Sequence, residues 1–260
     1  MTEQNISIVG GESLLGRDLR DQLADKRLSG RLQLIGSDED VAGILSEQEG
    51  EAVVLAALDS DRLQRSDVVF LAGSTRSSVR AYDLLAQSGA KPGLVDVTHG
   101  LEEYPNARLR SPMVEPHGFQ PPEGTIHVIA HPAASILASL LARLHRQHAI
   151  RHAVVQIFEP ASERGQVGLT ELQQQTTSLL TFKGLPKEIF DAQLSFNMLP
   201  RYGSDAPQHL EDVEQRIDRH LATLLNMDGQ VPMPSVRLAQ APVFHGYSMS
   251  LWIEFESYPG

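Results

Sequence analysis

The first half of the chain alternates short apolar runs with segments whose apolar residues recur at helical spacing. The apolar runs lie at 6–9, 32–35, 53–57, 68–72, 93–97 and 126–130. Leucines at 14, 15, 19 and 23 follow the first run at the spacing of a helix, and the pattern of Ser77–Gln87 predicts another helix. Strands that alternate with helices favour a parallel sheet with crossover helices. The pattern therefore predicts an α/β first domain.

The second half combines long helices with extended runs gathered towards its end. Pro132 opens a strongly apolar helix, in keeping with the preference of proline for the first helical turn. Further helices are predicted over 169–180 and 213–224, and strands over 153–158, 194–199, 236–244 and 248–255. This arrangement favours an antiparallel or mixed α+β domain. A loop rich in Pro, Glu and Gly at 112–124 precedes the run at 126–130, and we place the boundary there, which gives domains 1–130 and 131–260.

The composition is that of an ordinary globular protein with an acidic surface. The 260 residues are 41% hydrophobic and 21% charged, which is enough for a proper core. The 22 Lys and Arg against 33 Asp and Glu leave a net charge of -11, the wrong sign for binding phosphate backbones or anionic membranes. No apolar run approaches the roughly 20 residues that cross a bilayer, and the first residues lack the pattern of a secretion signal. We therefore expect a cytoplasmic protein with no nucleic-acid or membrane partner.

The chain contains no cysteine. This excludes disulfides, thiolate metal sites and every mechanism that uses a cysteine nucleophile.

Three glycines, Gly10, Gly11 and Gly16, separate the first predicted strand from the first helix. In Rossmann-like domains such a turn presents backbone N–H groups and the helix dipole to a pyrophosphate. Here Ser13 stands where the dinucleotide fingerprint has its middle glycine, and Glu12 adds a carboxylate beside the phosphate position. The acidic residues 38–40 could accept the ribose hydroxyls of NAD but would repel the extra phosphate of NADP. Two interpretations stay open: a nucleotide site at Gly10, Gly11, Ser13 and Gly16 with NAD as its cofactor, or a tight turn without a ligand.

Several segments carry a family likeness: the opening strand with its glycine turn, Ala-His-Pro-Ala-Ala-Ser at 130–135, Phe-Asn-Met-Leu-Pro at 196–200 and Ala-Pro-Val-Phe-His-Gly-Tyr-Ser at 241–248. Together they resemble the aspartate-semialdehyde dehydrogenase family, and the segments at 196–200 and 240–244 are most similar to its cysteine-lacking Usg-type branch. The resemblance extends from Ile6 to Glu256. It implies a Rossmann-like nucleotide-binding N-terminal domain and an α+β C-terminal domain for catalysis and dimerisation. It also implies a homodimer through the C-terminal domain, with an active family member as the alternative partner.

The reaction of that family requires groups that this sequence lacks. A thiolate attacks an aldehyde, a hydride leaves to the nicotinamide, and phosphate cleaves the thioester. The family's Asn-Cys pair aligns with Ala133 and Ala134, and its histidine base aligns with Tyr247, whose ordinary pKa of about 10 suits proton transfer at neutral pH poorly. The substrate-binding arginine aligns with Gln240 and the active-site glutamine with Glu159. A second arginine and a lysine of the family align with Glu102 and Glu214.

These replacements predict a protein without the parent activity. We expect a catalytically inactive dimeric scaffold or association partner. Two alternatives stay open, an NAD-binding sensor and an oxidoreductase or other enzyme with altered chemistry. The family continues for roughly another 70 to 80 residues beyond this C-terminus. The second domain is therefore expected to be C-terminally shortened, either naturally or because the sequence is a fragment.

Other polar residues have simpler explanations. The resemblance brings a set of histidines and carboxylates towards the family's cleft, and such groups suit zinc, but no local spacing supports a site and we expect no metal. The set comprises His131, His99, His117, Glu115 and Glu159. Ser135 lacks a nucleophile elbow and a base, so we expect it to cap a helix or pack in its first turn. Glu163, Arg164 and Glu171 are expected at the surface, and Tyr247 and Trp252 packed against the sheet.

Overall fold

The computed structural model describes residues 4–25, 30–37, 45–48, 51–116, 118–227 and 231–257. The acidic residues 38–40 and His117 lie outside these ranges. The chain divides into two compact units, Met1–Arg110 with Gln120–Ile129, and Ser111–Phe119 with Ala130–Gly260. Compared with a single boundary after residue 130, the segment Ser111–Phe119 and the residue Ala130 belong to the second unit instead of the first. Ser111 accounts for the grouping of its segment with the second unit, because its hydroxyl donates to the Ser135 hydroxyl oxygen at 3.1 Å.

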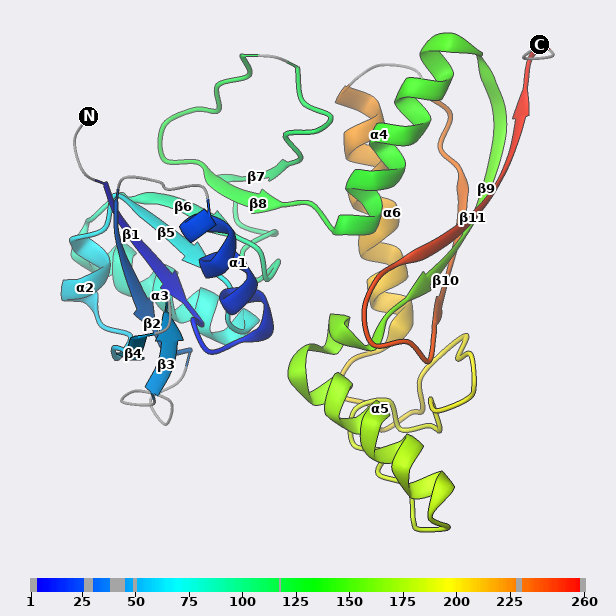
Figure 1. The fold of residues 1–260 in the computed structure, drawn as a ribbon. Coiled ribbons are helices and arrows are strands. Elements are labelled where there is room, and N and C mark those ends of the chain that lie inside the picture. Colours follow the sequence, from blue (N-terminus) through cyan, green and yellow to red (C-terminus); the bar gives the residue numbers. More distant parts are fainter. Residues whose placement is uncertain are drawn as a thin grey trace. The chain divides into compact units, whose positions relative to one another are not determined.

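The first unit is built on a six-stranded sheet in the order β2-β1-β5-β6-β8-β7, in which every pair is parallel. The strands are β1 (Gln4–Val9), β2 (Gly30–Ile35), β5 (Val68–Leu71), β6 (Gly93–Asp96), β7 (Ala107–Arg110) and β8 (Ile126–Ile129). The helices are α1 (Leu14–Asp25), α2 (Ser60–Gln64) and α3 (Thr75–Ser88). The predicted α/β domain with a parallel sheet is thereby confirmed (Figure 1).

Both faces of this sheet are covered by apolar side chains. Successive residues of β1 contribute to different cores, because neighbouring side chains of a strand point to opposite faces. Val9 belongs to a core that includes Ala81 and Leu85 of α3, and Ile8 to a core against which Leu19 and Leu23 of α1 pack. Burial on both faces explains why the parallel strands read as continuous apolar runs.

The apolar run at 53–57 does not form a strand of the main sheet. Instead β4 (Glu51–Val54) pairs with β3 (Leu45–Gln48) in a separate antiparallel ribbon. The rest of the run joins the main sheet only through a single bridge between Ala56 and Ile35. Strand β7 was not predicted, because an edge strand that alternates between half-buried and exposed residues has a weak apolar signal.

The second unit has a three-stranded mixed sheet in the order β10-β9-β11. Its elements are α4 (Pro132–Gln147), β9 (Ile150–Glu159), the 3-10 turn η2 (Ala161–Arg164), α5 (Gly165–Leu180), α6 (Leu210–Met227), β10 (Ser235–Gln240) and β11 (Ser248–Phe255). β9 is parallel to β10 and antiparallel to β11. Figure 1 shows α4 and α6 side by side along one face of this sheet. The predicted mixed α+β domain is confirmed.

The strand predicted at 194–199 is wrong. Side-chain hydrogen bonds replace a strand ladder there, since the Gln175 side-chain carbonyl accepts from the backbone N–H groups of Leu194 at 2.8 Å and Ser195 at 3.0 Å. The N–H of Asn197 then donates to the Leu194 carbonyl at 2.9 Å, which closes a turn. Only Leu199 pairs with a strand residue, Gln240, through an isolated bridge.

The predicted strand at 236–244 is too long. β10 ends at Gln240, and the carbonyls of Val243 and Phe244 accept hydrogen bonds from the N–H groups of Ala161 and Ser162 in η2. A backbone that is used by a helical turn cannot also continue the ladder with β9. The segment that follows β10 is therefore tied to η2.

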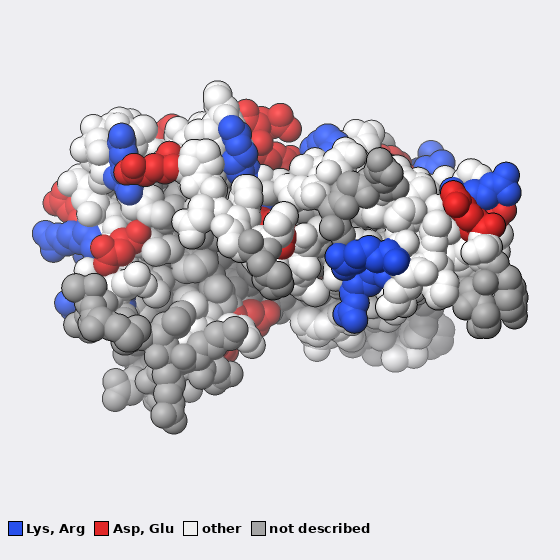
Figure 2. Space-filling view, turned by 90° about the horizontal axis from the view of Figure 1, so that it is seen from above, with Lys and Arg blue, Asp and Glu red and all other residues white. Residues whose placement is uncertain are grey.

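Within the described part of the chain, no helix is long and apolar enough to cross a bilayer. On the face shown in Figure 2, Lys and Arg side chains occur singly or beside Asp and Glu and form no continuous stripe.

Candidate functional site

The glycines of the first turn are required by the chain's own packing. Gly10 has a φ of 87°, in the left-handed region, and a Cβ added to it would lie 2.1 Å from the Cα of Gly73. A Cβ on Gly16 would lie 2.1 Å from the carbonyl oxygen of Gly10. The N–H groups of Gly10 and Gly11 both donate to the Ile35 carbonyl, at 2.8 and 3.1 Å. These glycines are therefore explained by the close approach of backbone segments, without any ligand.

The side chains between these glycines are engaged within the first unit. The Ser13 hydroxyl donates to the Ala72 carbonyl at 2.6 Å and accepts from the Gly16 N–H at 2.8 Å. The Glu12 carboxylate accepts from the Ser37 N–H at 3.0 Å and also from the Ser37 hydroxyl. Its other oxygen, Oε2, is buried and has no hydrogen-bond partner among the described residues. The turn thus holds an anchored negative charge next to the start of α1.

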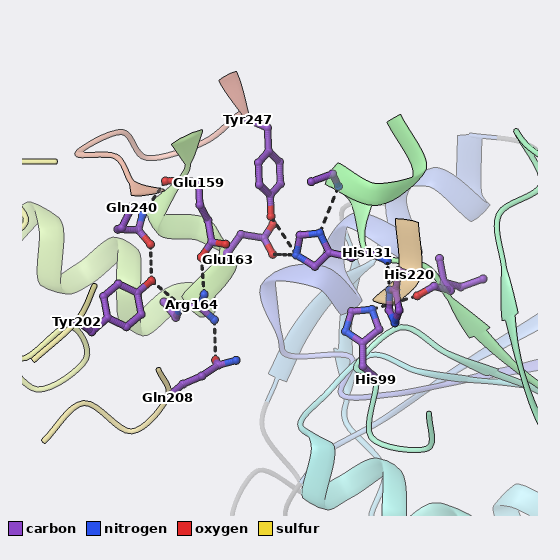
Figure 3. A network of polar contacts seen from close by, with 12 residues as sticks. His99, His131, Glu159, Glu163, Arg164, Tyr202, Gln208, His220, Gln240 and Tyr247 are labelled. Atoms are coloured by element: carbon purple, nitrogen blue, oxygen red, sulfur yellow. Dashed lines mark hydrogen bonds and ion pairs between the residues drawn. The ribbon is translucent and has the colours of Figure 1, made fainter. Parts of the chain in front are cut away.

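In the second unit, His131 connects the start of α4 with the segment after β10. It is the N-cap residue of α4, and its Nδ1 accepts from the Ala133 N–H at 3.3 Å. Its Nε2 lies 3.3 Å from the Tyr247 hydroxyl oxygen and 3.9 Å from a carboxylate oxygen of Glu163. Tyr247 and Glu163 are also hydrogen-bonded to each other. Figure 3 shows these three side chains pointing toward one another.

The hydrogen bonds assign the tautomer of His131 and the direction of this chain. A backbone N–H can only donate, so Nδ1 of His131 must accept and the neutral ring carries its proton on Nε2. That proton faces Tyr247, whose own hydroxyl then donates to the Glu163 carboxylate. A metal-binding histidine needs the opposite arrangement, with one bare nitrogen towards the metal and the other N–H donating to an acceptor. His131 in this state is therefore not a metal ligand.

A second polar cluster surrounds Arg164, at the end of η2. Its guanidinium pairs with the Glu159 carboxylate and donates to the Tyr202 hydroxyl at 3.1 Å and to the Gln208 side-chain oxygen at 2.6 Å. Tyr202 donates in turn to Gln240, whose amide donates to the Glu159 carbonyl at 2.8 Å. The side chain of Arg164 is 8% exposed and that of Glu159 is fully buried. The cluster is thus a buried ion pair enclosed by amides and a phenol (Figure 3).

Burial dominates the electrostatics of this cluster. It raises the pKa of Glu159 from 4.5 to about 7, against the attraction of Arg164, which acts in the opposite direction. Burial alone would lower the pKa of Arg164, but the neighbouring Glu159 carboxylate raises it above its ordinary value. Burial also raises the pKa of Glu163 and of Tyr247. At neutral pH, Glu159 is therefore close to the midpoint of its titration while Arg164 is charged.

The structure brings together only some of the residues singled out from the sequence. Ala133 and Ala134 are fully buried in the first turn of α4, and Gln240 and Glu159 lie in the cluster around Arg164. Glu214 is elsewhere in the second unit and pairs with Arg237 at 2.9 Å. Glu102 belongs to the first unit.

Several histidines and carboxylates were considered as possible metal ligands. Glu115 accepts from the Ser111 N–H at 2.9 Å, and His99 belongs to the first unit, where its Nε2 lies 3.0 Å from the Ile129 carbonyl. Among the described residues, no group of three His, Cys, Asp or Glu side chains is arranged to hold a metal ion. Ser135 lies in the first turn of α4 as predicted, but the capping residue is His131.

Several surface assignments are wrong. Arg164 is buried, and Glu171 is only 4% exposed because its carboxylate accepts from the backbone N–H groups of Ile189 and Phe190. Glu163 is partly buried at 28% exposure. Conversely, Trp252 is 58% exposed and does not pack inside the unit.

The sequence did not predict a buried role for Arg164, and it did not identify Tyr202 and Gln208 at all. Arg164 lies five residues after Glu159, the last residue of β9. Pro160 precedes the intervening 3-10 turn and Gly165 follows it, and this turn brings the arginine back to the end of the strand. Tyr202 and Gln208 lie in irregular segments far along the chain, where no periodicity identifies them.

Comparison with known proteins agrees with the family likeness. Residues 141–259 match the family described as semialdehyde dehydrogenase, dimerisation domain. The chain is 24% identical over 254 residues to an aspartate-semialdehyde dehydrogenase of Synechocystis sp., which covers 96% of this chain and 72% of that protein. It is 29% identical over 254 residues to the USG-1 protein homolog of Azotobacter vinelandii, which covers 96% of this chain and 73% of that protein.

The fold has a close counterpart among solved structures. A probable aspartate-semialdehyde dehydrogenase from Pseudomonas aeruginosa matches with a TM-score of 0.84 and 24% identity, over 98% of this chain and 75% of that chain. The resemblance noted from the sequence is thereby confirmed for the fold and for the relationship to both groups of proteins.

Proposed function

The chain is a homologue of the aspartate-semialdehyde dehydrogenases and of the USG-1 proteins. We propose that its function is nevertheless not the dehydrogenase reaction. The protein acts by association, as a non-catalytic cytoplasmic dimer formed through its second unit. The observation that carries this proposal is the pair of buried methyl groups at Ala133 and Ala134, where the family resemblance places the Asn-Cys pair.

No nucleophile replaces the missing thiol at this position. The chain contains no cysteine, and both alanines are 0% exposed. The adjacent hydroxyl of Ser135 accepts a hydrogen bond from the Ser111 hydroxyl, and among the described residues no basic side chain is hydrogen-bonded to it. A covalent acyl intermediate therefore has no atom on which to form.

The groups that would assist a nucleophile are also committed elsewhere. Tyr247, at the position of the family's histidine base, has a raised pKa and lies in a hydrogen-bonded chain with His131 and Glu163. Gln240, at the position of the substrate-binding arginine, has no charge, and the nearby Arg164 is paired with Glu159. The position of the family's base therefore holds a poor base for neutral pH, and Arg164 is not an unpaired cation for a substrate carboxylate.

The proposal predicts that restoring the thiol does not restore activity. We expect Ala134→Cys, like the wild type, to show no phosphate-dependent reduction of NAD or NADP with aspartate semialdehyde, measured by absorbance of the reduced nicotinamide. Because the chain has no other cysteine, a thiol titration of the unfolded variant counts one sulfhydryl and verifies the protein. A steady turnover above the enzyme-free rate in either protein would contradict the proposal.

The surface proposed for association is the face of the β10-β9-β11 sheet that α4 and α6 leave uncovered. Trp252 of β11 lies directly opposite Val154 of β9 on this face, and they are 58% and 49% exposed. Polar residues surround them, including Gln156, Ser250 and Arg237. An aromatic centre with a polar rim is typical of protein interfaces, and the matched family is described as a dimerisation domain.

Charging the centre of this face should separate the subunits. We expect Trp252→Glu to raise the dimer dissociation constant by roughly 30-fold or more, as for the loss of a tryptophan hot spot. Analytical ultracentrifugation across a concentration series measures it. Leu15→Glu, which charges a leucine of the first unit that is 45% exposed, is the matched control and should leave the dimer intact. A wild-type protein that is monomeric at all concentrations would refute homodimer formation.

Two alternatives remain as competing hypotheses. An NAD sensor requires measurable NAD affinity at the glycine turn, and an enzyme of altered chemistry requires a substrate that reaches the cluster of His131, Glu163 and Tyr247. The paired charges of Arg164 and Glu159 and the anchored carboxylate of Glu12 favour association over both.

A further inference from the structure

The glycine turn of the first unit departs from a dinucleotide site in a specific way. In the fingerprint G-x-G-x-x-G, the middle glycine lets the backbone approach a pyrophosphate, and N–H groups at the helix start bind it. Gly11, Ser13 and Gly16 hold the three positions here, so a side chain stands where the fingerprint has none.

Four N–H groups of the turn already donate hydrogen bonds within the chain. The N–H groups of Gly10 and Gly11 donate to the Ile35 carbonyl, and that of Ser13 donates to the Gly10 carbonyl at 3.0 Å. The N–H of Gly16 donates to the Ser13 hydroxyl. A pyrophosphate would have to displace these bonds, whereas in a nucleotide site such groups point at the ligand.

Ser13 also fastens the turn to the end of a neighbouring strand. Its hydroxyl donates to the carbonyl of Ala72, the residue that follows β5, while it accepts from Gly16. The side chain thus closes the turn from within, in a place where glycine would leave room for a ligand.

Glu12 supplies the negative charge that a bound phosphate would otherwise bring. One carboxylate oxygen accepts from both the N–H and the hydroxyl of Ser37, shortly after the end of β2. In a dinucleotide site the ligand itself links the first turn with the end of the second strand. The other oxygen, Oε2, is buried and has no hydrogen-bond partner among the described residues, so the contacts with Ser37 are the ones that hold the carboxylate in the turn.

We propose that Glu12 is an internal anion that takes the place of the dinucleotide phosphates in the first unit, with Ser13 and Ser37 holding it in position, so that the unit is closed to NAD and NADP. The residues present do not fit a bound dinucleotide, because its phosphates would meet the fixed carboxylate of Glu12 and the side chain of Ser13. This inference goes beyond the proposed association function and concerns the first unit alone.

The test is a gain of binding by Glu12→Ala/Ser13→Gly, which removes the carboxylate and restores the fingerprint glycine. Isothermal titration with NAD, NADH, NADP and NADPH is made on the full chain. We expect the wild type to show no heat of binding at millimolar nucleotide. We expect the double variant to bind with a dissociation constant at least tenfold below the weakest binding that the titration of the wild type could detect. Glu103→Ala, which removes an exposed carboxylate from the same unit, should remain silent like the wild type.

Each outcome decides the proposal. Millimolar or tighter binding by the wild type overturns it, and so does a folded double variant that fails to bind any of the four nucleotides. If the double variant does not fold, as judged by circular dichroism, Glu12→Gln/Ser13→Gly replaces it, since the amide keeps the shape of Glu12, removes its charge and leaves the glycine at position 13. If this variant folds and binds none of the four nucleotides, the proposal is overturned. The dimer measurements on Trp252→Glu are independent of these results.

Discussion

Replacing Arg164 by methionine is expected to destabilise the second unit by about 3–5 kcal/mol, because the change leaves a buried carboxylate without its counter-ion. Glu159 is fully buried, and Oε2 already has no partner among the described residues. Arg164→Met would remove the partner of Oε1 as well, together with the donors to Tyr202 and Gln208. Urea unfolding at pH 8, where Glu159 is mostly ionised in the wild type, measures the loss.

A double-mutant cycle separates the lost ion pair from lost packing. Glu159→Gln/Arg164→Met removes both charges, and we expect it to recover most of the stability lost by Arg164→Met alone, because no buried charge remains. Arg201→Met, at an exposed position of the same unit, is the matched control and should stay within about 0.5 kcal/mol of the wild type. Equal losses for Arg164→Met and the double variant would show that packing, and not the ion pair, is responsible.

The stability of the protein should also carry a pH-dependent contribution from Glu159. Its pKa is about 7 in the folded protein and 4.5 ordinarily. Between these values the folded state binds more protons than the unfolded state, so the free energy of unfolding falls as pH rises. The contribution is fully present below pH 4.5 and is lost as pH rises through 7. Each tenfold difference in proton affinity is worth about 1.4 kcal/mol, so the whole contribution is about 3 kcal/mol.

This contribution is measured as a difference between two proteins. Urea unfolding is followed from pH 4.5 to 8 for the wild type and for Glu159→Gln, and the wild type should lose stability relative to the variant as pH rises. Taking the difference cancels the titration of groups that do not interact with Glu159, whereas the contribution of Glu163, whose charge raises the pKa of Glu159, stays within the measured difference. Glu211→Gln, on the exposed side of α6, is the matched control. A difference that is constant with pH would show that Glu159 stays ionised throughout.

Much of the fold followed from periodicity alone. The strands around Ile8, Val69 and Val155 and the long helix of Ile217 are buried, and burial leaves a regular spacing of apolar residues along the chain. The segment 194–199 is apolar too, but the amide of Gln175 takes its backbone hydrogen bonds and makes it a turn. An apolar run predicts that a segment is buried, but it does not predict which groups form hydrogen bonds with the backbone of that segment.

For the candidate site too, some features follow from the sequence and others only from the tertiary structure. The sequence by itself determined that the chain has no cysteine and that Ala134, Gln240 and Tyr247 stand where the resemblance places functional residues of the family, because these are properties of composition and order. Only the tertiary structure decided that Arg164 is buried against Glu159 and that Glu12 is anchored by Ser37. A charged side chain is stable in the interior only where a partner from another part of the chain compensates its lost hydration, and that partner is brought near by folding, not by spacing along the sequence.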